Sequence, residues 1–220
     1  MRVEEKLNEY LEKVAGENIT RVRSGKFNIS GLGGCYRKQY YDRINLRKTP
    51  LTLDTRKVFK MGDIVHEFLQ SLYPLSECEV KCETDHYVGY ADIVTDFEVI
   101  DIKSVNSNAW NFIKAKKGED FSTHRARVLK EKIHNVYQVV YYAHLIGKEK
   151  AWLCFVNKNT MECIEVMVLV KDYIDDIMKE VATLERFWND EEVPAAEPKL
   201  FKGKECAYCS FLKTCKYPED

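Results

Sequence analysis

The chain has 220 residues, of which 45% are hydrophobic and 31% are charged, and its net charge at neutral pH is −1. This length suits one domain with small additions. No apolar run approaches the roughly 20 residues that a membrane span needs, and the balanced charge excludes the overall basic surface of many nucleic-acid-binding proteins. Any nucleic-acid site must therefore be a local patch.

The predicted elements alternate between helices and short strands. The first segment, MRVEEKLNEYLEK, is charged and has apolar residues at helical spacing, so we expect an amphipathic helix, no signal peptide and a cytoplasmic location. Residues 15–34 look irregular. Further helices are predicted at 35–44, 54–73, 132–147 and 171–189, and strands at 78–83, 86–95, 97–104, 150–157 and 162–169. This order indicates an α/β sandwich and not an all-parallel sheet.

The helix predicted at 54–73 has Asp54 as its expected cap. Its expected apolar side consists of Val58, Met61, Val65, Phe68, Leu69 and Leu72. The stretch 105–132 is basic and shows little periodicity, whereas the helix at 132–147 should end at Gly147.

Charged residues interrupt the apolar stretch GYADIVTDFEVIDIKSV, residues 89–105. If Thr95–Glu98 is the turn of a hairpin, Asp92 pairs across from Asp101, and Lys103 lies on the same face. Two facing carboxylates suit Mg²⁺ or Mn²⁺, and a neighbouring lysine can stabilise charge on a phosphate. The alternative interpretation of the same three residues is a solvated strand face with a salt bridge.

Other residues complete an ordered set of motifs around this hairpin. His66 lies in GDIVHEF, and Gln138 and Tyr142 lie four apart on one side of a helix. In this order the motifs resemble the RecB-like branch of the PD-(D/E)-x-K nuclease superfamily. The resemblance implies a restriction-endonuclease-like core, with a mixed central sheet flanked by helices.

The chain contains eight cysteines, and their number calls for an explanation such as metal binding or burial. Cys206, Cys209 and Cys215 are closely spaced, and with Cys35 they indicate a four-cysteine site for Zn²⁺ or an iron–sulfur cluster. Spacing does not choose between these metals, and a tail of free thiols is a third alternative. The remaining cysteines lie in predicted strands and should be buried: Cys78, Cys82, Cys154 and Cys163.

One cysteine before the nuclease motifs and a C-x₂-C-x₅-C tail after them resemble the CRISPR-associated RecB-like exonucleases, the Cas-four family. The resemblance implies an N-terminal helical region at 1–53, a nuclease core at 54–190 and a cysteine-rich tail at 191–220. It implies a [4Fe–4S] cluster held by Cys35, Cys206, Cys209 and Cys215. It also implies Mn²⁺ or Mg²⁺ held by His66, Asp92, Asp101 and the Ile102 carbonyl, a catalytic Lys103, and support of the site or DNA contact from Gln138 and Tyr142.

The sequence departs from the family pattern in two places. Asp101 stands where glutamate is more usual, and the region between Lys103 and Gln138 is long and basic. That region interleaves cations with aromatic rings, which describes either a single-strand channel or an ordinary solvated helical surface. Its residues are Lys114, Lys116, Lys117, Arg125, Arg127, Lys130 and Lys132 with Trp110, Phe112 and Phe121.

By this resemblance we expect a metal-dependent exonuclease that acts mainly on single-stranded DNA, 5′ to 3′, and trims DNA for CRISPR spacer acquisition with the integrase proteins. The alternatives are a stand-alone or viral repair nuclease of the same fold and a zinc-stabilised, non-catalytic nucleic-acid-binding module. We expect no membrane association. Endonuclease activity and homo-oligomer formation stay open.

Overall fold

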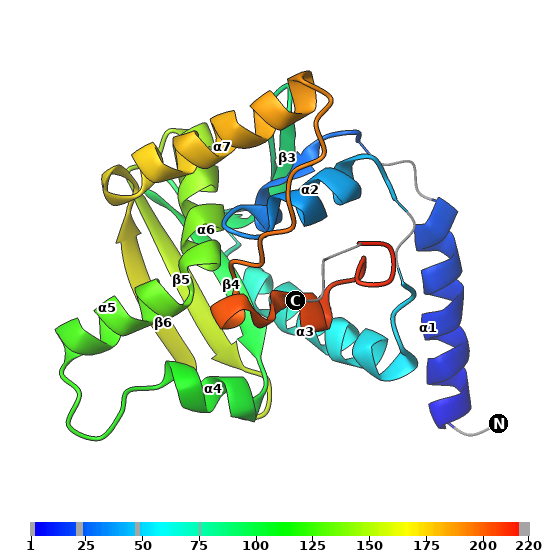
Figure 1. Cartoon of the computed structure of the whole chain (residues 1–220). Coiled ribbons are helices and arrows are strands. Elements are labelled where there is room, and N and C mark those ends of the chain that lie inside the picture. The colour runs from blue at the N-terminus through cyan, green and yellow to red at the C-terminus, as the bar shows by residue number, and fades with distance from the viewer. Residues whose placement is uncertain (1–2, 21–23, 47–48, 75, 216–220) are drawn as a thin grey trace.

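The structure is a computed structural model, and it describes residues 3–20, 24–46, 49–74 and 76–215. Figure 1 labels its elements in chain order. The α-helices are α1 (Val3–Thr20), α2 (Tyr36–Arg43), α3 (Leu53–Ser71), α4 (Ser107–Ile113), α5 (Phe121–Glu131), α6 (Ile133–Ile146) and α7 (Ile174–Asn189). The strands are β1 (Phe27–Asn28), β2 (Glu77–Glu83), β3 (Tyr87–Val94), β4 (Glu98–Val105), β5 (Lys150–Asn157) and β6 (Cys163–Leu169). Short 3₁₀ helices lie at Ile29–Gly31, Val170–Asp172 and Phe201–Tyr208.

One mixed sheet organises the described part of the chain. Its strand order is β1-β3-β4-β5-β6, and β2 also pairs with β3. The β3–β4 hairpin and the β5–β6 hairpin are antiparallel, whereas β4 and β5 run parallel. The parallel pair requires a crossover, and α4, α5 and α6 supply it. The prediction of a mixed sheet flanked by helices is confirmed.

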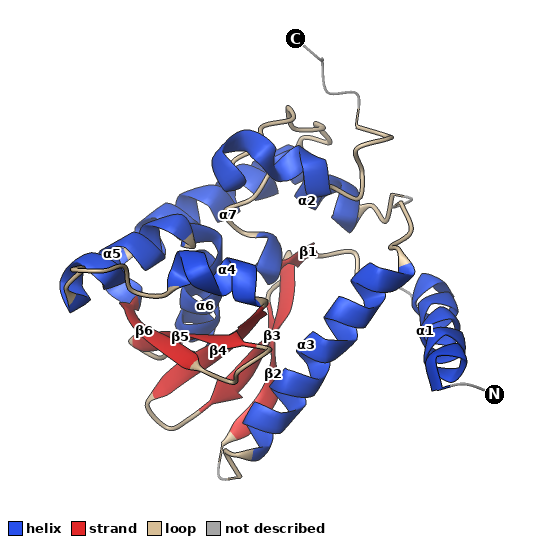
Figure 2. Ribbon diagram, turned by 90° about the horizontal axis from the view of Figure 1, so that it is seen from below, coloured by secondary structure: helices blue, strands red, loops and turns tan. Residues whose placement is uncertain are grey.

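The sheet carries a core on each face. The larger core packs α6 and α7 against the sheet, with Val139, Leu153 and Leu184 fully enclosed. The smaller core lies on the α3 side, where Val65 belongs to one cluster with Ile100 and Ile102. Figure 2 shows α3 running beside the sheet, with α1 lying outside α3. A strand such as β4 therefore divides its residues between two helical layers.

The predicted strands and most helices agree with the structure to within a few residues, but three predictions are wrong and the helices of one stretch were not predicted. The first helix extends to Thr20, and part of the stretch expected to be irregular forms β1. Thr52, not Asp54, caps α3, because its side chain accepts a hydrogen bond from the Thr55 amide. The stretch 105–132 forms α4 and α5.

A further correction concerns the apolar side of α3. Val65 is buried, and Leu69 is partly buried beside the smaller core. The other predicted core positions are about half exposed: Val58, Met61, Phe68 and Leu72. The helix therefore presents much of its apolar surface outward. None of the helices in the described ranges is long and apolar enough to span a membrane.

Candidate active site

The acidic hairpin brings Asp92 and Asp101 together. Its register pairs Ile93 with Ile100 and Val94 with Val99, so the next positions along the strands are Asp92 and Asp101. At this point the Asp92 carboxylate Oδ2, and not a backbone carbonyl, accepts the Ile102 amide at 2.6 Å. The predicted register is confirmed. The two strands separate here, and that separation leaves space for side-chain chemistry between them.

Lys103 neutralises part of the buried charge. Its Nζ lies 2.6 Å from Asp101 Oδ2. Asp101 is completely buried, and beyond this ion pair neither of its oxygens has a hydrogen-bond partner among the described residues. Burial raises the pKa of Asp101 to about 6, although the Lys103 charge acts in the opposite direction. Burial likewise raises the pKa of Asp92 to about 6.

His66 reaches the carboxylates from α3. Its Nδ1 lies 3.7 Å from Asp92 Oδ2. Burial, and then the positive charge of Lys103, lower the pKa of His66 below its usual value of 6.5. The imidazole is therefore neutral at neutral pH, which is the form that can ligate a metal.

Two residues near the site escaped the sequence analysis. Gln70, one helical turn after His66, donates from Nε2 to the Asp92 carbonyl at 3.2 Å and to Glu79 Oε1 at 2.8 Å. Glu79 lies within β2 and has a φ of 53°, a left-handed conformation that few non-glycine residues adopt. Gln70 could have been found from the sequence, because it lies four residues after His66 and therefore on the same side of the helix. Glu79 could not, because its position depends on the β2–β3 register.

Gln138 and Tyr142 of α6 lie together beneath the hairpin. Gln138 Nε2 donates to Tyr142 Oη at 3.4 Å, and both side chains are buried. Burial raises the pKa of Tyr142 well above its usual value. The hydrogen bond from Gln138 acts in the opposite direction, and the charge of Asp101 adds to the effect of burial. Gly89 allows this packing, since a Cβ there would lie 2.6 Å from Tyr142 Oη.

The donor set fits a hard divalent cation. It offers two carboxylates and a neutral imidazole, and the buried Asp101 oxygens lack hydrogen bonds. As the side chains stand, however, no group of three or more His, Cys, Asp or Glu residues in the described ranges is arranged to hold a metal ion. The Lys103 ammonium is the cation that contacts Asp101.

A cavity of about 860 Å³ adjoins the carboxylates. His66 and Gln70 form its boundary with the site, and it extends toward the ends of β4 and β5. Its other lining residues are Val58, Phe59, Gly62, Asp63, Glu67, Glu79, Ser104, Val105, Asn106, Ala109 and Lys158. This volume is typical of ligand sites.

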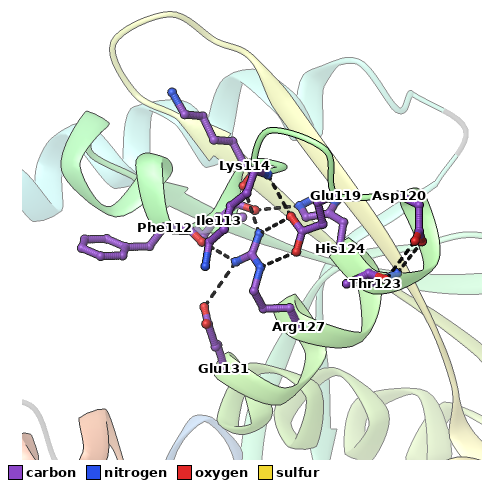
Figure 3. A network of polar contacts seen from close by, with 10 residues as sticks. Phe112, Ile113, Lys114, Glu119, Asp120, Thr123, His124, Arg127 and Glu131 are labelled. Atoms are coloured by element: carbon purple, nitrogen blue, oxygen red, sulfur yellow. Dashed lines mark hydrogen bonds and ion pairs between the residues drawn. The ribbon is translucent and has the colours of Figure 1, made fainter.

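The basic stretch divides into structural and exposed residues. Arg127 donates to Glu119 and to the carbonyls of Phe112 and Lys114, which fixes the connection between α4 and α5 (Figure 3). Arg125 donates to the Met167 carbonyl, and Trp110 is buried. These residues do not form an open channel. The exposed members are Phe112, Phe121, Lys114, Lys116, Lys117 and Lys130, and Lys132 is partly buried.

The four predicted cluster cysteines line one small cavity. Cys35, Cys206, Cys209 and Cys215 meet there beside Arg37. Arg37 Nη1 lies 3.8 Å from Cys215 Sγ, and Glu205 accepts the Cys35 amide at 3.1 Å. Four cysteine side chains at one place are a donor set that suits Zn²⁺ or an iron–sulfur cluster, so the chemistry of the donor set fits a thiolate-bound metal. The other cysteines were expected to be buried, but Cys78 and Cys163 are exposed.

Comparison of the whole structure with solved structures finds similar folds. A crystal structure of SSO0001 matches with a TM-score of 0.59 and 20% identity, over 98% of this chain and 96% of that one. A phage-related exonuclease from Haemophilus somnus 129PT matches with a TM-score of 0.55 and 13% identity, over 80% of this chain and 97% of that one. LHK-Exo, crystallised with dAMP, matches with a TM-score of 0.51 and 14% identity, over 76% of this chain and 89% of that one.

LHK-Exo is an alkaline exonuclease from Laribacter hongkongensis. The chain has the fold of these exonucleases. The likeness extends to the mixed sheet and its flanking helices, so the fold predicted from the motifs is confirmed. A scan against protein-family models finds no match, and neither does a search of curated proteins.

Proposed function

We propose that this protein is a metal-dependent DNA exonuclease that acts mainly on single strands. The observation that carries the proposal is the buried pair Asp92 and Asp101, with Lys103 and His66 beside it, at the point where β3 and β4 separate. An exonuclease fold surrounds this pair. A solvated strand face does not account for it, because Asp101 has no solvent exposure.

The side chains divide the work of phosphodiester hydrolysis. Asp92, Asp101, His66 and the Ile102 carbonyl would hold Mn²⁺ or Mg²⁺, which when bound polarises a phosphoryl oxygen and lowers the pKa of water. Lys103 places a positive charge where negative charge builds up on the phosphate. The Ile102 amide fixes the Asp92 carboxylate. Gln138 and Tyr142 support the strand that carries Asp92 from beneath.

We also propose that the four cysteines hold a [4Fe–4S] cluster, which joins the N-terminal region to the tail. Their meeting in one cavity beside Arg37 supports a thiolate-bound metal. The choice of cluster over zinc, the 5′ to 3′ polarity and a role in CRISPR spacer acquisition with integrase proteins are supported by the motif resemblance alone. A stand-alone repair nuclease would use the same site.

The test is cleavage of single- and double-stranded DNA that is labelled at either end, with Mn²⁺, with Mg²⁺ and with a chelator. We expect metal-dependent release of short products from single strands, with the order of product sizes giving the polarity. Metal-independent cleavage, or no cleavage of any labelled DNA by the anaerobically purified protein, would contradict the proposal.

A further inference from the structure

The cavity beside His66 contains groups that the proposed hydrolysis does not use. β4 and β5 run parallel, and Ser104, Val105 and Lys158 line the cavity near their C-terminal ends. Open α/β sheets bind ligands beyond the C-terminal ends of parallel strands. The cavity adjoins the carboxylates through His66, so whatever occupies it lies next to the reacting phosphate.

Phe59 gives this cavity a flat apolar surface. Its side chain is 55% exposed although it lines the cavity, and its neighbour Val58 is 52% exposed. An exposed ring on a rigid helix costs solvation, and a nucleobase stacked on it would cover that surface. A base inside a duplex is stacked between its neighbours and could not do so without leaving the duplex.

The cavity brings one lysine, Lys158, together with carboxylates of α3. Lys158 Nζ donates to the Val58 carbonyl at 2.9 Å, and burial lowers the pKa of Lys158. On the α3 wall, Asp63 and Glu67 lie 3.9 Å and 3.8 Å from Lys60 Nζ. These carboxylates repel a phosphate but can accept hydrogen bonds from the amino groups of a base.

Gly62 lines the cavity where α3 lies close to Ser104 and Lys158. A Cβ at this position would lie 3.2 Å from Ser104 Oγ and 3.4 Å from Lys158 Nζ. Glycine is a poor helix former. Here its lack of a side chain lets Lys158 approach α3.

From these contacts we propose that the cavity binds one unpaired nucleotide of the substrate strand, with its base on Phe59 and a phosphate beside Lys158. The proposal rests on the proposed nuclease function and specifies how single strands would be selected. It places the selected nucleotide next to the scissile phosphate, on the α3 side of the carboxylates.

The experiment measures binding of a fluorescent single-stranded oligonucleotide by anisotropy, with Ca²⁺ in place of Mn²⁺ to prevent cleavage. Phe59→Ala should weaken binding roughly tenfold, as expected for one lost stack, and Phe59→Trp should restore it. The matched control is Phe68→Ala, because Phe68 is on the same helix, is 52% exposed and lies outside the cavity. Equal affinities of Phe59→Ala and Phe68→Ala would overturn the proposal.

An abasic oligonucleotide gives a second measurement. Removing the base that stacks should weaken binding by wild-type protein and leave Phe59→Ala unaffected. If the abasic position that weakens wild-type binding most weakens Phe59→Ala binding by the same factor, the ring does not stack on that base and the proposal fails. Loss of binding in Phe59→Ala supports the cavity even if the wild-type protein never cleaves, whereas cleavage without that loss supports only the nuclease function.

Discussion

At the scale of single residues, the site depends on placing two carboxylates where water does not reach them. Asp101 is fully buried and Asp92 nearly so; Lys103 forms an ion pair with Asp101, and the Ile102 amide donates to Asp92. Buried charged groups destabilise the fold unless they are paired or bind a ligand. The site therefore has a stability cost in the metal-free protein, and that cost can be measured.

Removal of either central residue should abolish cleavage. We expect Asp92→Ala and Lys103→Ala to lower the Mn²⁺-dependent rate on single-stranded DNA by roughly a hundredfold or more, with circular dichroism spectra that match the wild type. Asp96→Ala is the control, because Asp96 is exposed in the same hairpin turn. Full activity of both site variants would refute the assignment.

The raised pKa values give a pH dependence. Burial raises the pKa of Asp92 from 3.8 to about 6, so the folded state binds a proton more tightly than the unfolded state does. In the metal-free protein, the stabilisation from this proton is present below about pH 4 and is lost as the pH rises to about 6. Mn²⁺ requires the charged carboxylates.

The increase in melting temperature on adding Mn²⁺ should therefore be small at pH 5 and large at pH 7.5. Differential scanning calorimetry at both pH values measures it. Asp92→Asn combined with Asp101→Asn should show no increase at either pH. If Mn²⁺ raised the melting temperature of the wild-type protein as much at pH 5 as at pH 7.5, that result would be incompatible with cation binding to these carboxylates.

The residue-scale predictions succeeded where a local pattern determined the outcome. Strand alternation and a short turn were enough to place Asp92 opposite Asp101. The pattern could not identify Glu79 or the exposed face of α3, since both depend on how distant elements meet. Nor could it separate Arg127, which binds Glu119, from an exposed lysine such as Lys116.

At the scale of elements, the contact between β3 and α6 sets the position of the hairpin. Gly89 of β3 lies against Tyr142 of α6, and an added Cβ would come within 2.6 Å of Oη and 2.8 Å of Cε1. The hydroxyl is held by Gln138. Because Asp92 follows three residues after Gly89, displacement of this contact should move the carboxylate.

Gly89→Ala should therefore destabilise the protein by about 1–3 kcal/mol, the usual cost of overpacking, and should reduce cleavage. Chemical denaturation measures the first effect. Tyr142→Phe removes the atom nearest to the new Cβ, so Gly89→Ala with Tyr142→Phe should lose less stability than the sum of the two single changes. Strict additivity would show that the two positions do not press on each other.

At the scale of the whole molecule, four cysteines from segments far apart in the sequence line one cavity. Cys35 immediately precedes α2, whereas Cys206, Cys209 and Cys215 follow the last α-helix. Their spacing in the sequence was enough to predict that they meet. It could not predict the surrounding charges, since the distance between Arg37 and Cys215 depends on how α2 and the tail pack together.

A metal bound by these thiolates would act as a cross-link that closes most of the chain. Cys206→Ala should abolish the visible absorbance of an iron–sulfur cluster in anaerobically purified protein and lower stability by roughly 4 kcal/mol, as for loss of a cross-link across a long loop. Cys163→Ala is the control, because Cys163 is an exposed cysteine of β6 outside the cavity. Iron with acid-labile sulfide in wild-type protein indicates the cluster. Zinc without sulfide would replace it with a single-ion site, and the absence of both would refute a metal cross-link.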